Sequence, residues 1–247
     1  MREPFLPGVP VQHVLDRLDA AGGNEIASGK FAHPESSAAL AVNAFGWFIE
    51  RPQLFPALPG PEFAGGAQRV EVEYCARFPW SRGRHPWLDA VVFTKEYIIG
   101  VESKRYEPFR DAKHVSLPPA YDRPVWGDKM LGFCAVRDAL RSGELQFRHL
   151  DAAQLVKHAF GLVTEGRRLG KRPQLFYIFA EPAVLAGKAI PSEDHARHRV
   201  EIATFAAKIA GDEVRFASGS YHEWLSTWTE GTDEGQHAVA LRRLFSL

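Results

Sequence analysis

Three charged residues are spaced so that they could act together in one chemical step. Asp89 stands near the start of the apolar stretch WLDAVVF, and Glu102 and Lys104 end a second one, YIIGVESK. Glu102 and Lys104 are two residues apart, so on a strand their side chains point to the same face of the sheet. Burying a carboxylate and an ammonium is costly unless they pair or bind an ion. The pattern therefore predicts either a metal site or a buried ion pair.

The chemistry expected of such a group is metal-assisted hydrolysis. Two carboxylates held close together repel each other, and a divalent cation relieves that repulsion. Oxygen ligands suit Mg²⁺, with Mn²⁺ as the alternative ion, rather than zinc. The Ser103 carbonyl, between the two side chains, could add a ligand. A metal held in this way activates water and stabilises charge on a phosphoryl oxygen. Lys104 could orient or help to deprotonate the nucleophile, or hold the scissile phosphate.

A hairpin is the element that would bring these residues together. The two apolar stretches are typical of strands joined by a turn at residues 94–96. The start of the first strand then lies beside the end of the second, which places Asp89 next to Glu102. Before the hairpin, residues 34–50 have helical spacing, and residues 69–78 alternate as a half-buried strand does.

Helices and strands alternate after the hairpin. The patterns predict helices at 128–142 and 152–166, a strand buried on both faces at 175–180, a helix at 193–209, a strand at 214–216 and a helix at 221–228. This order predicts an α/β fold with a central mixed β-sheet flanked by helices. No linker is evident, so we expect one domain over residues 1–247, with a core at 33–181 and a helix-strand-helix extension at 190–247.

The motif as a whole resembles the signature of the PD-(D/E)XK nucleases. Asp89 is followed thirteen residues later by Glu102, Ser103 and Lys104 at the end of an apolar strand. That superfamily includes restriction endonucleases and many repair and recombination nucleases. Its core runs helix, three-strand meander, helix and fourth strand (α-β-β-β-α-β), which the expected elements follow over residues 33–181. The resemblance implies a restriction-endonuclease-like fold.

The resemblance also implies roles for individual residues. Asp89 and Glu102 would bind the metal, and Lys104 would be the catalytic lysine. Members of the superfamily often add an acid from the first core helix to the metal site. Glu35 is the matching candidate here, and Glu50 is the second.

Further positions match the superfamily in part. A glutamine on the second core helix is frequent and would be Gln154, with Lys157 and His158 one turn further on. The motif proline should directly precede the aspartate, but Pro86 stands three residues earlier. A second acid-x-lysine pattern at residues 111–113 has no apolar strand before it, which separates it from the motif on the hairpin.

Structural alternatives remain open for these positions. The three motif residues could form a salt-bridged strand end. Glu35 could complement the dipole of a helix start, and Gln154 could cap neighbouring backbone. His158 is interpreted as a helix-face residue rather than a ligand.

Composition limits the function classes. The chain has a formal net charge of zero, which excludes a protein that binds nucleic acid through a strongly basic surface overall. Local basic patches are still possible at 77–85, 104–114 and 167–172. Cys75 and Cys134 form no spaced pair that would indicate a disulfide framework or a zinc site. No signal peptide or membrane span is evident. We therefore expect a cytoplasmic protein.

The residues and the resemblance together predict a Mg²⁺-dependent nuclease, with an endonuclease acting on DNA as the leading hypothesis. The alternative is a catalytically inactive nuclease-fold protein that binds nucleic acid or another protein. A small-molecule hydrolase is a weaker reading, because the chain has neither a GxSxG nor a GxxxxGK motif. Cutting both strands of a duplex would suit a homodimer. DNA versus RNA, specificity, and endonucleolytic versus exonucleolytic attack stay open.

Overall fold

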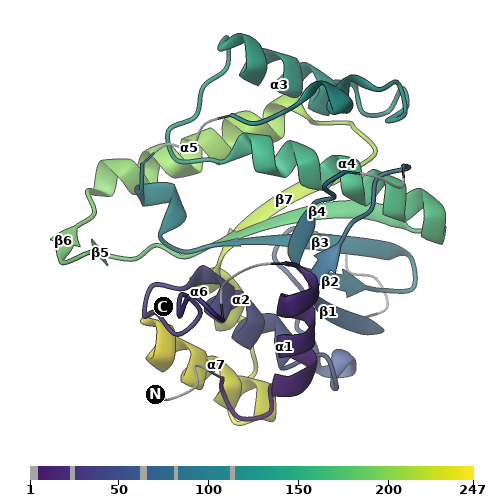
Figure 1. The fold of residues 1–247 in the computed structure, drawn as a ribbon. Helices are drawn as coiled ribbons and strands as arrows, with labels where there is room; N and C mark the ends of the chain where they lie inside the picture. The colour runs from purple at the N-terminus through teal and green to yellow at the C-terminus, as the bar shows by residue number, and fades with distance from the viewer. Residues whose placement is uncertain (1–4, 23–25, 62–65, 81–82, 112–114) are drawn as a thin grey trace.

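The computed structural model describes residues 5–22, 26–61, 66–80, 83–111 and 115–247. In these ranges a five-stranded sheet with the order β1-β2-β3-β4-β7 forms the centre of the molecule (Figure 1). Its strands are β1 Arg69–Cys75, β2 Trp87–Phe93, β3 Tyr97–Lys104, β4 Arg172–Phe179 and β7 Arg215–Ser220, and a separate small hairpin consists of β5 Val184–Leu185 and β6 Lys188–Ala189. The expected α/β fold with a mixed central sheet flanked by helices is confirmed.

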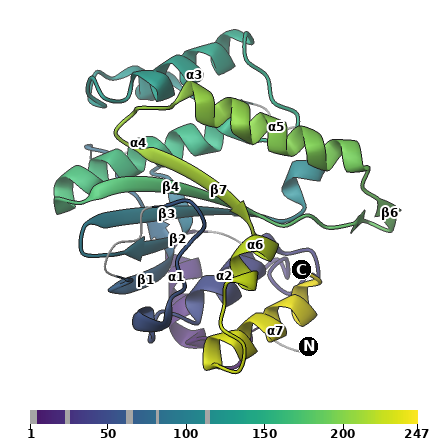
Figure 2. The same cartoon turned by 180° about the vertical axis from the view of Figure 1, so that it is seen from behind.

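Helices cover both faces of the sheet (Figures 1 and 2). One face carries α1 Val11–Ala20, α2 Ser37–Gly46, α6 Tyr221–Ser226 and α7 Asp233–Phe245. The other carries α3 Leu131–Ser142, α4 Ala152–Leu169 and α5 Ser192–Lys208. Short 3-10 helices lie between these elements: η1 Pro52–Leu54, η2 Glu107–Phe109 and η3 Pro119–Asp122. Each face has its own apolar core, so the central strands are buried on both sides.

The β2–β3 hairpin turns at residues 94–96, as the sequence predicts. The N–H of Thr94 donates to the carbonyl of Tyr97 at 3.0 Å, and the Thr94 hydroxyl accepts from the N–H of Tyr97 at 2.9 Å. In the antiparallel ladder Ala90 lies opposite Val101. Asp89 and Glu102 are the next residues outward on the two strands. The hairpin register therefore brings the two acids to the same end of the sheet.

Parallel pairing places the ends of further strands at that same edge. β3 pairs with β4 from Tyr97 and Arg172 to Lys104 and Phe179, and β4 pairs in parallel with β7. Helix α4 packs closely on β3 because Gly100 has no side chain. A Cβ atom at that position would lie 2.7 Å from Leu162 of α4. This close approach brings the first half of α4 over the carboxyl end of β3.

The observed elements differ from the expected ones at their ends. Helix α2 begins at Ser37, because the Ser36 side chain caps it by accepting from the N–H of Ala39. Glu35 therefore lies in the loop before the helix. Helix α7, which Thr232 caps, was not predicted from the sequence.

No helix within the described ranges is long and apolar enough to span a membrane.

Candidate active site at the carboxyl end of β3

A buried ion pair lies at the end of β3. The ammonium of Lys104 contacts the Oε1 atom of Glu102, and the side chains are 10% and 1% exposed. The other carboxylate oxygen of Glu102 lies 3.0 Å from Nδ1 of His158 on α4. Glu102 is thus held between a strand lysine and a helix histidine, on the sheet face that α4 covers.

Asp89 joins this group through the backbone of β3. Its Oδ2 atom accepts a hydrogen bond from the N–H of Ser103 at 2.6 Å. The Ser103 hydroxyl is 2.7 Å from the Tyr221 hydroxyl at the start of α6, on the opposite face of the sheet. The segment from Glu102 to Lys104 is therefore fixed from both faces.

Helix α4 supplies two residues on one face. Gln154 and His158 are four residues apart, and the spacing of an α-helix puts both on the same side. The Oε1 atom of Gln154 is buried with no hydrogen-bond partner in the part of the chain that the structure describes. His158 is buried against Glu102, a placement that the sequence analysis missed. Its spacing from Gln154 was the available signal.

The two acids expected from the first core helix lie elsewhere. Glu35 pairs with Arg110 at 3.1 Å, and its Oε1 atom accepts from the N–H of Ala186 at 3.4 Å. Glu35 thus joins the loop after η2 to the tip of the β5–β6 hairpin. Glu50 is exposed beyond the end of α2.

Glu107 is the acid that the tertiary structure brings close to Lys104. Its carboxylate accepts hydrogen bonds from the Ser37 hydroxyl and from the N–H groups of Arg105 and Tyr106, the latter two at 3.0 and 3.1 Å. Burial opposes ionisation of Glu107, but Lys104 and these donors outweigh it and lower its pKa. The sequence left Glu107 as a charged neighbour without a role, and nothing in its local pattern marked it.

The two carboxyl groups of the motif differ in their ionisation. Desolvation, with the neighbouring Glu102 charge, raises the pKa of Asp89 well above its usual range. Desolvation also acts on Glu102, but Lys104 and His158 outweigh it and lower the pKa of Glu102 to about 2. One acid is thus held as a carboxylate while the other tends to keep its proton.

Lys104 keeps its charge. Burial alone would lower its pKa, but the charges of Glu102, Asp89 and Glu107 raise it above the usual range. A lysine that stays protonated can donate hydrogen bonds and neutralise a phosphate, and it is a poor acceptor of protons. The environment thus favours an orienting or phosphate-holding role over proton abstraction.

The donors at this site fit a hard divalent cation with few protein ligands. Both oxygens of Glu102 are buried, and Lys104 and His158 contact one each. In the ranges described, no group of three or more His, Cys, Asp or Glu side chains is arranged to hold a metal. Mg²⁺ is commonly bound by only one or two carboxylates, with water and substrate phosphate completing its shell. Asp89 and Glu102 match that kind of site.

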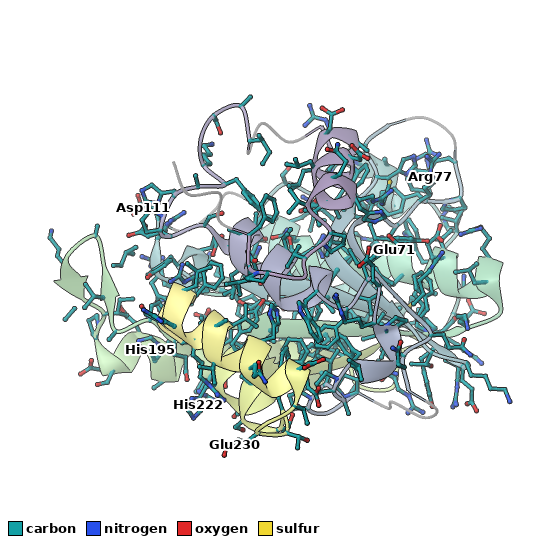
Figure 3. All side chains as sticks on the ribbon, turned by 90° about the horizontal axis from the view of Figure 1, so that it is seen from below. Glu71, Arg77, Asp111, His195, His222 and Glu230 are labelled. Atoms are coloured by element: carbon teal, nitrogen blue, oxygen red, sulfur yellow. The ribbon has the colours of Figure 1, made fainter. Side chains whose placement is uncertain are left out.

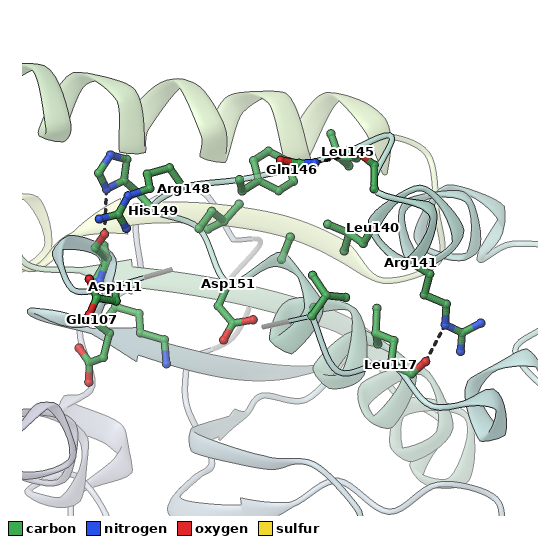
Figure 4. Close-up of a pocket in the computed structure, with 18 of the residues that line it drawn as sticks. Glu107, Asp111, Leu117, Leu140, Arg141, Leu145, Gln146, Arg148, His149 and Asp151 are labelled. Carbon is green, nitrogen blue, oxygen red and sulfur yellow. Dashed lines mark hydrogen bonds between the residues drawn. The ribbon is translucent and has the colours of Figure 1, made fainter. Parts of the chain in front are cut away.

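A cavity of about 620 Å³ opens beside this group (Figure 4). Lys104 and Glu107 lie at one end, and the start of α4, including Asp151, forms part of the wall. The Asp151 side chain also caps α4 by accepting from the N–H of Gln154 at 3.0 Å. Ligands of open α/β sheets bind outside the carboxyl ends of the strands, which is where this cavity lies.

The three predicted basic patches differ in what the structure shows of their residues. Residues 81–82 and 112–114, which belong to two of them, lie outside the described residues. Arg77 of the first patch lies across the molecule from Asp111, which lines the cavity (Figure 3). In the third patch, Arg167 pairs with Glu213 at 2.6 Å.

Comparison with known proteins identifies one family. The model of REase-ARP, described as Restriction Endonuclease associating with ARP, matches residues 4–244. Searches of curated proteins and of solved structures each found no match. The matched region spans nearly the whole chain and includes every strand of the central sheet.

Proposed function

This chain belongs to the REase-ARP family of restriction-endonuclease-associated proteins, and from that premise we propose that it is a metal-dependent nuclease of the PD-(D/E)XK type acting on DNA. The observation that carries the proposal is the grouping of the half-buried Asp89 with the buried pair Glu102 and Lys104 at the carboxyl end of β3. A buried carboxylate–ammonium pair seldom increases stability over apolar side chains of similar size. Its position beside a cavity fits a catalytic use.

Asp89 and Glu102 would hold the metal, with the Ser103 carbonyl as a further ligand. Mg²⁺, or Mn²⁺ in its place, would supply an activated water and stabilise charge on the phosphoryl oxygen. Asp89 would have to give up its proton to serve as a ligand, because a metal binds the carboxylate form. Glu102 is already ionised, so it needs no such step.

The remaining residues position the substrate. Lys104 holds the scissile phosphate through its ammonium, which the surrounding acids keep protonated. His158 orients the Glu102 carboxylate from the side opposite Lys104. Gln154, whose buried Oε1 atom has no hydrogen-bond partner among the described residues, would accept one from the attacking water. Glu35 would enter the metal site only by leaving Arg110.

The test is cleavage of plasmid and single-stranded DNA with Mg²⁺ or Mn²⁺. We expect Asp89→Asn and Lys104→Ala to reduce the cleavage rate at least about 100-fold, the scale of losing one group that acts in the transition state. Glu96→Gln, at the opposite end of the sheet, is the control and should cleave as the wild type does. Equal rates for all four proteins would contradict the proposal.

One observation favours a catalytically inactive member of the family as the second candidate. Lys104 and His158 occupy both oxygens of Glu102, so an ion must displace or rearrange one of them. Calorimetric titration with Mg²⁺ separates the two candidates. Heat of binding that disappears in Glu102→Ala supports the nuclease, and the absence of binding to the wild type supports an interaction module.

The proposal extends to the organisation and partners of the protein. We place residues 1–247 in one domain, because β7 from the C-terminal extension pairs directly with β4 of the core. The family description names an association with ARP, and we carry that partner over to this chain. Cleavage of both strands of a duplex would use a homodimer. Cys75 and Cys134 are both free, which suits the proposed location in the cytoplasm.

A further inference from the structure

The cavity beside Lys104 has both polar and apolar lining residues, and phosphate binding alone does not explain the apolar ones. Six apolar side chains from two segments line it: Val115, Leu117, Leu140, Leu145, Phe147 and Leu150. Tyr177 of β4 adds an aromatic ring near Lys104. The volume of about 620 Å³ falls in the range of pockets that enclose small organic ligands, roughly 300–1,000 Å³.

One wall of the cavity is fixed from behind by a buried acid. Glu201 of α5 accepts hydrogen bonds from three successive backbone N–H groups, those of Arg148, His149 and Leu150, at 2.8, 2.7 and 3.0 Å. These three residues lead directly into Asp151 at the start of α4. The segment before α4 is therefore held in one conformation.

The two walls are also joined to each other. Arg148 donates to the carbonyl of Arg110 at 2.7 Å, and Arg141 donates to the carbonyl of Leu117 at 2.6 Å (Figure 4). His149 makes a third link, at 2.8 Å, to the carbonyl of Pro108. A cavity with walls joined in this way is preformed, so binding does not have to order it first.

The charges around the cavity do not favour a free anion. Three acids and three cationic residues line it: Glu107, Asp111 and Asp151 against Lys104, Arg141 and Arg148. The two arginines already donate to backbone carbonyls. The cavity thus suits an uncharged group that has both apolar surface and hydrogen-bonding atoms and is attached to a phosphate lying at Lys104.

We propose that this cavity receives one unpaired base of the strand being cut, next to the phosphate held by Lys104. The inference rests on the proposed nuclease function and adds its substrate class. A paired base is stacked inside the duplex and reaches a pocket beside the scissile phosphate only by rotating out, at a cost of several kcal/mol. The expected substrate is therefore DNA with unpaired nucleotides at the cleavage point, either single-stranded or at a junction.

Binding of a fluorescent base tests the cavity independently of cleavage. The probe is a single-stranded oligonucleotide carrying one 2-aminopurine, mixed with the Asp89→Asn protein in metal-free buffer. Leu145→Trp fills the cavity from a half-buried position on one wall, and Val115→Trp fills it from the other. Leu169→Trp, at the far end of α4, is the matched control. Circular dichroism verifies that each variant is folded.

We expect both cavity-filling variants to bind the oligonucleotide about tenfold more weakly, the effect of losing one base contact, and the control to bind normally. The 2-aminopurine signal should change on binding only where the cavity is open. Equal affinity and equal signal in all proteins would overturn the inference. Free 2-aminopurine deoxynucleotide is a second arm, and tighter binding of it than of the strand would indicate a nucleotide effector site instead.

Cleavage assays separate the failure of this inference from the failure of the nuclease proposal. With an active enzyme, an abasic nucleotide at the cleavage point or the Leu145→Trp substitution should slow cutting of single-stranded DNA about tenfold. Unchanged cutting in both cases rejects the base pocket and leaves the nuclease intact. No cutting by any protein, together with a fluorescence change lost only in the cavity variants, rejects the nuclease and retains the pocket.

Discussion

The two ends of the parallel strands each carry a cavity, but the cavities differ in how their charges are held. At the amino ends of β3, β4 and β7 a cavity of about 780 Å³ lies between loops and α5. Five cationic residues line it: Lys129, Arg167, Lys171, Arg172 and Arg215. The cavity at the carboxyl ends is lined by the motif lysine, Lys104, which lies close to Glu102 and Asp89.

Exposure is what separates the two regions. At the amino ends, Arg167 pairs with Glu213 and Arg172 with Glu96, and the arginine side chains are 40% and 55% exposed. The side chain of Glu102, at the other end, is 1% exposed. Exposed pairs are screened by water and are worth little, whereas a buried pair persists only where the fold enforces it. Burial of charge, rather than the number of cationic side chains, therefore marks the candidate site.

The largest expected difference between the two ends is in catalysis. Glu102→Gln removes the charge of a proposed metal ligand and should reduce cleavage of DNA with Mg²⁺ by about 10²–10⁴-fold. Glu213→Gln makes the same change in the other cavity and should leave the rate within about twofold. Rates of plasmid cleavage for both variants provide the measurement. A comparable loss of cleavage rate in both variants would show that the two ends of the sheet do not differ in catalysis.

A smaller difference is expected in stability. Lys104→Ala removes the ammonium beside the buried carboxylate of Glu102 and leaves His158 as its remaining side-chain neighbour, so it should lower the free energy of unfolding by about 3 kcal/mol. Arg172→Ala breaks an exposed pair and should cost less than about 1 kcal/mol. Urea denaturation of both variants measures the change in the free energy of unfolding. A loss for Arg172→Ala as large as that for Lys104→Ala would show that burial is not decisive.

Asp89 should make the carboxyl end sensitive to pH. Because the folded protein raises the pKa of Asp89, the unfolded chain loses this proton first as the pH rises above 3.8. In that window the folded state binds more protons, so Asp89 reduces stability progressively with rising pH. Asp89→Asn should therefore raise the melting temperature at pH 7 without metal, by about 2–4 °C per kcal/mol gained. The exposed Asp128→Asn is the control, and a lower melting temperature for Asp89→Asn would refute this reasoning.

The smallest effect is expected from Glu35. Its carboxylate pairs with Arg110 and the N–H of Ala186, away from the buried motif, so Glu35→Gln should change the Mg²⁺ concentration for half-maximal cleavage less than about threefold. Arg110→Gln removes the same pair from its other side and should behave alike. A large shift for Glu35→Gln alone would place Glu35 in the metal site after all.

Most of the sheet could be read from the sequence because its signals are local. The apolar runs of β2 and β3 and the turn at residues 94–96 fix a hairpin, and the hairpin fixes which residues lie opposite each other. The buried run of β4 and the helical periodicity of α4 gave the parallel crossover. Helix α7 was missed because its core-facing side includes Gly235 and His237 while Val239 and Leu244 are exposed, so the apolar residues do not form a clear stripe.

The sequence by itself determined the chemistry at the strand end. Asp89, Glu102 and Lys104 follow from the two-residue period of strands and from the antiparallel return of a hairpin, which need no distant contact. Only the tertiary structure decided which other groups join them. It brings His158 to Glu102 and Glu107 to Lys104, and it holds Glu35 against Arg110. His158 and Glu35 are far along the chain from their partners, and Glu107, three residues from Lys104, is held by the Ser37 hydroxyl of α2. Packing between such distant segments leaves no periodic signal in the sequence.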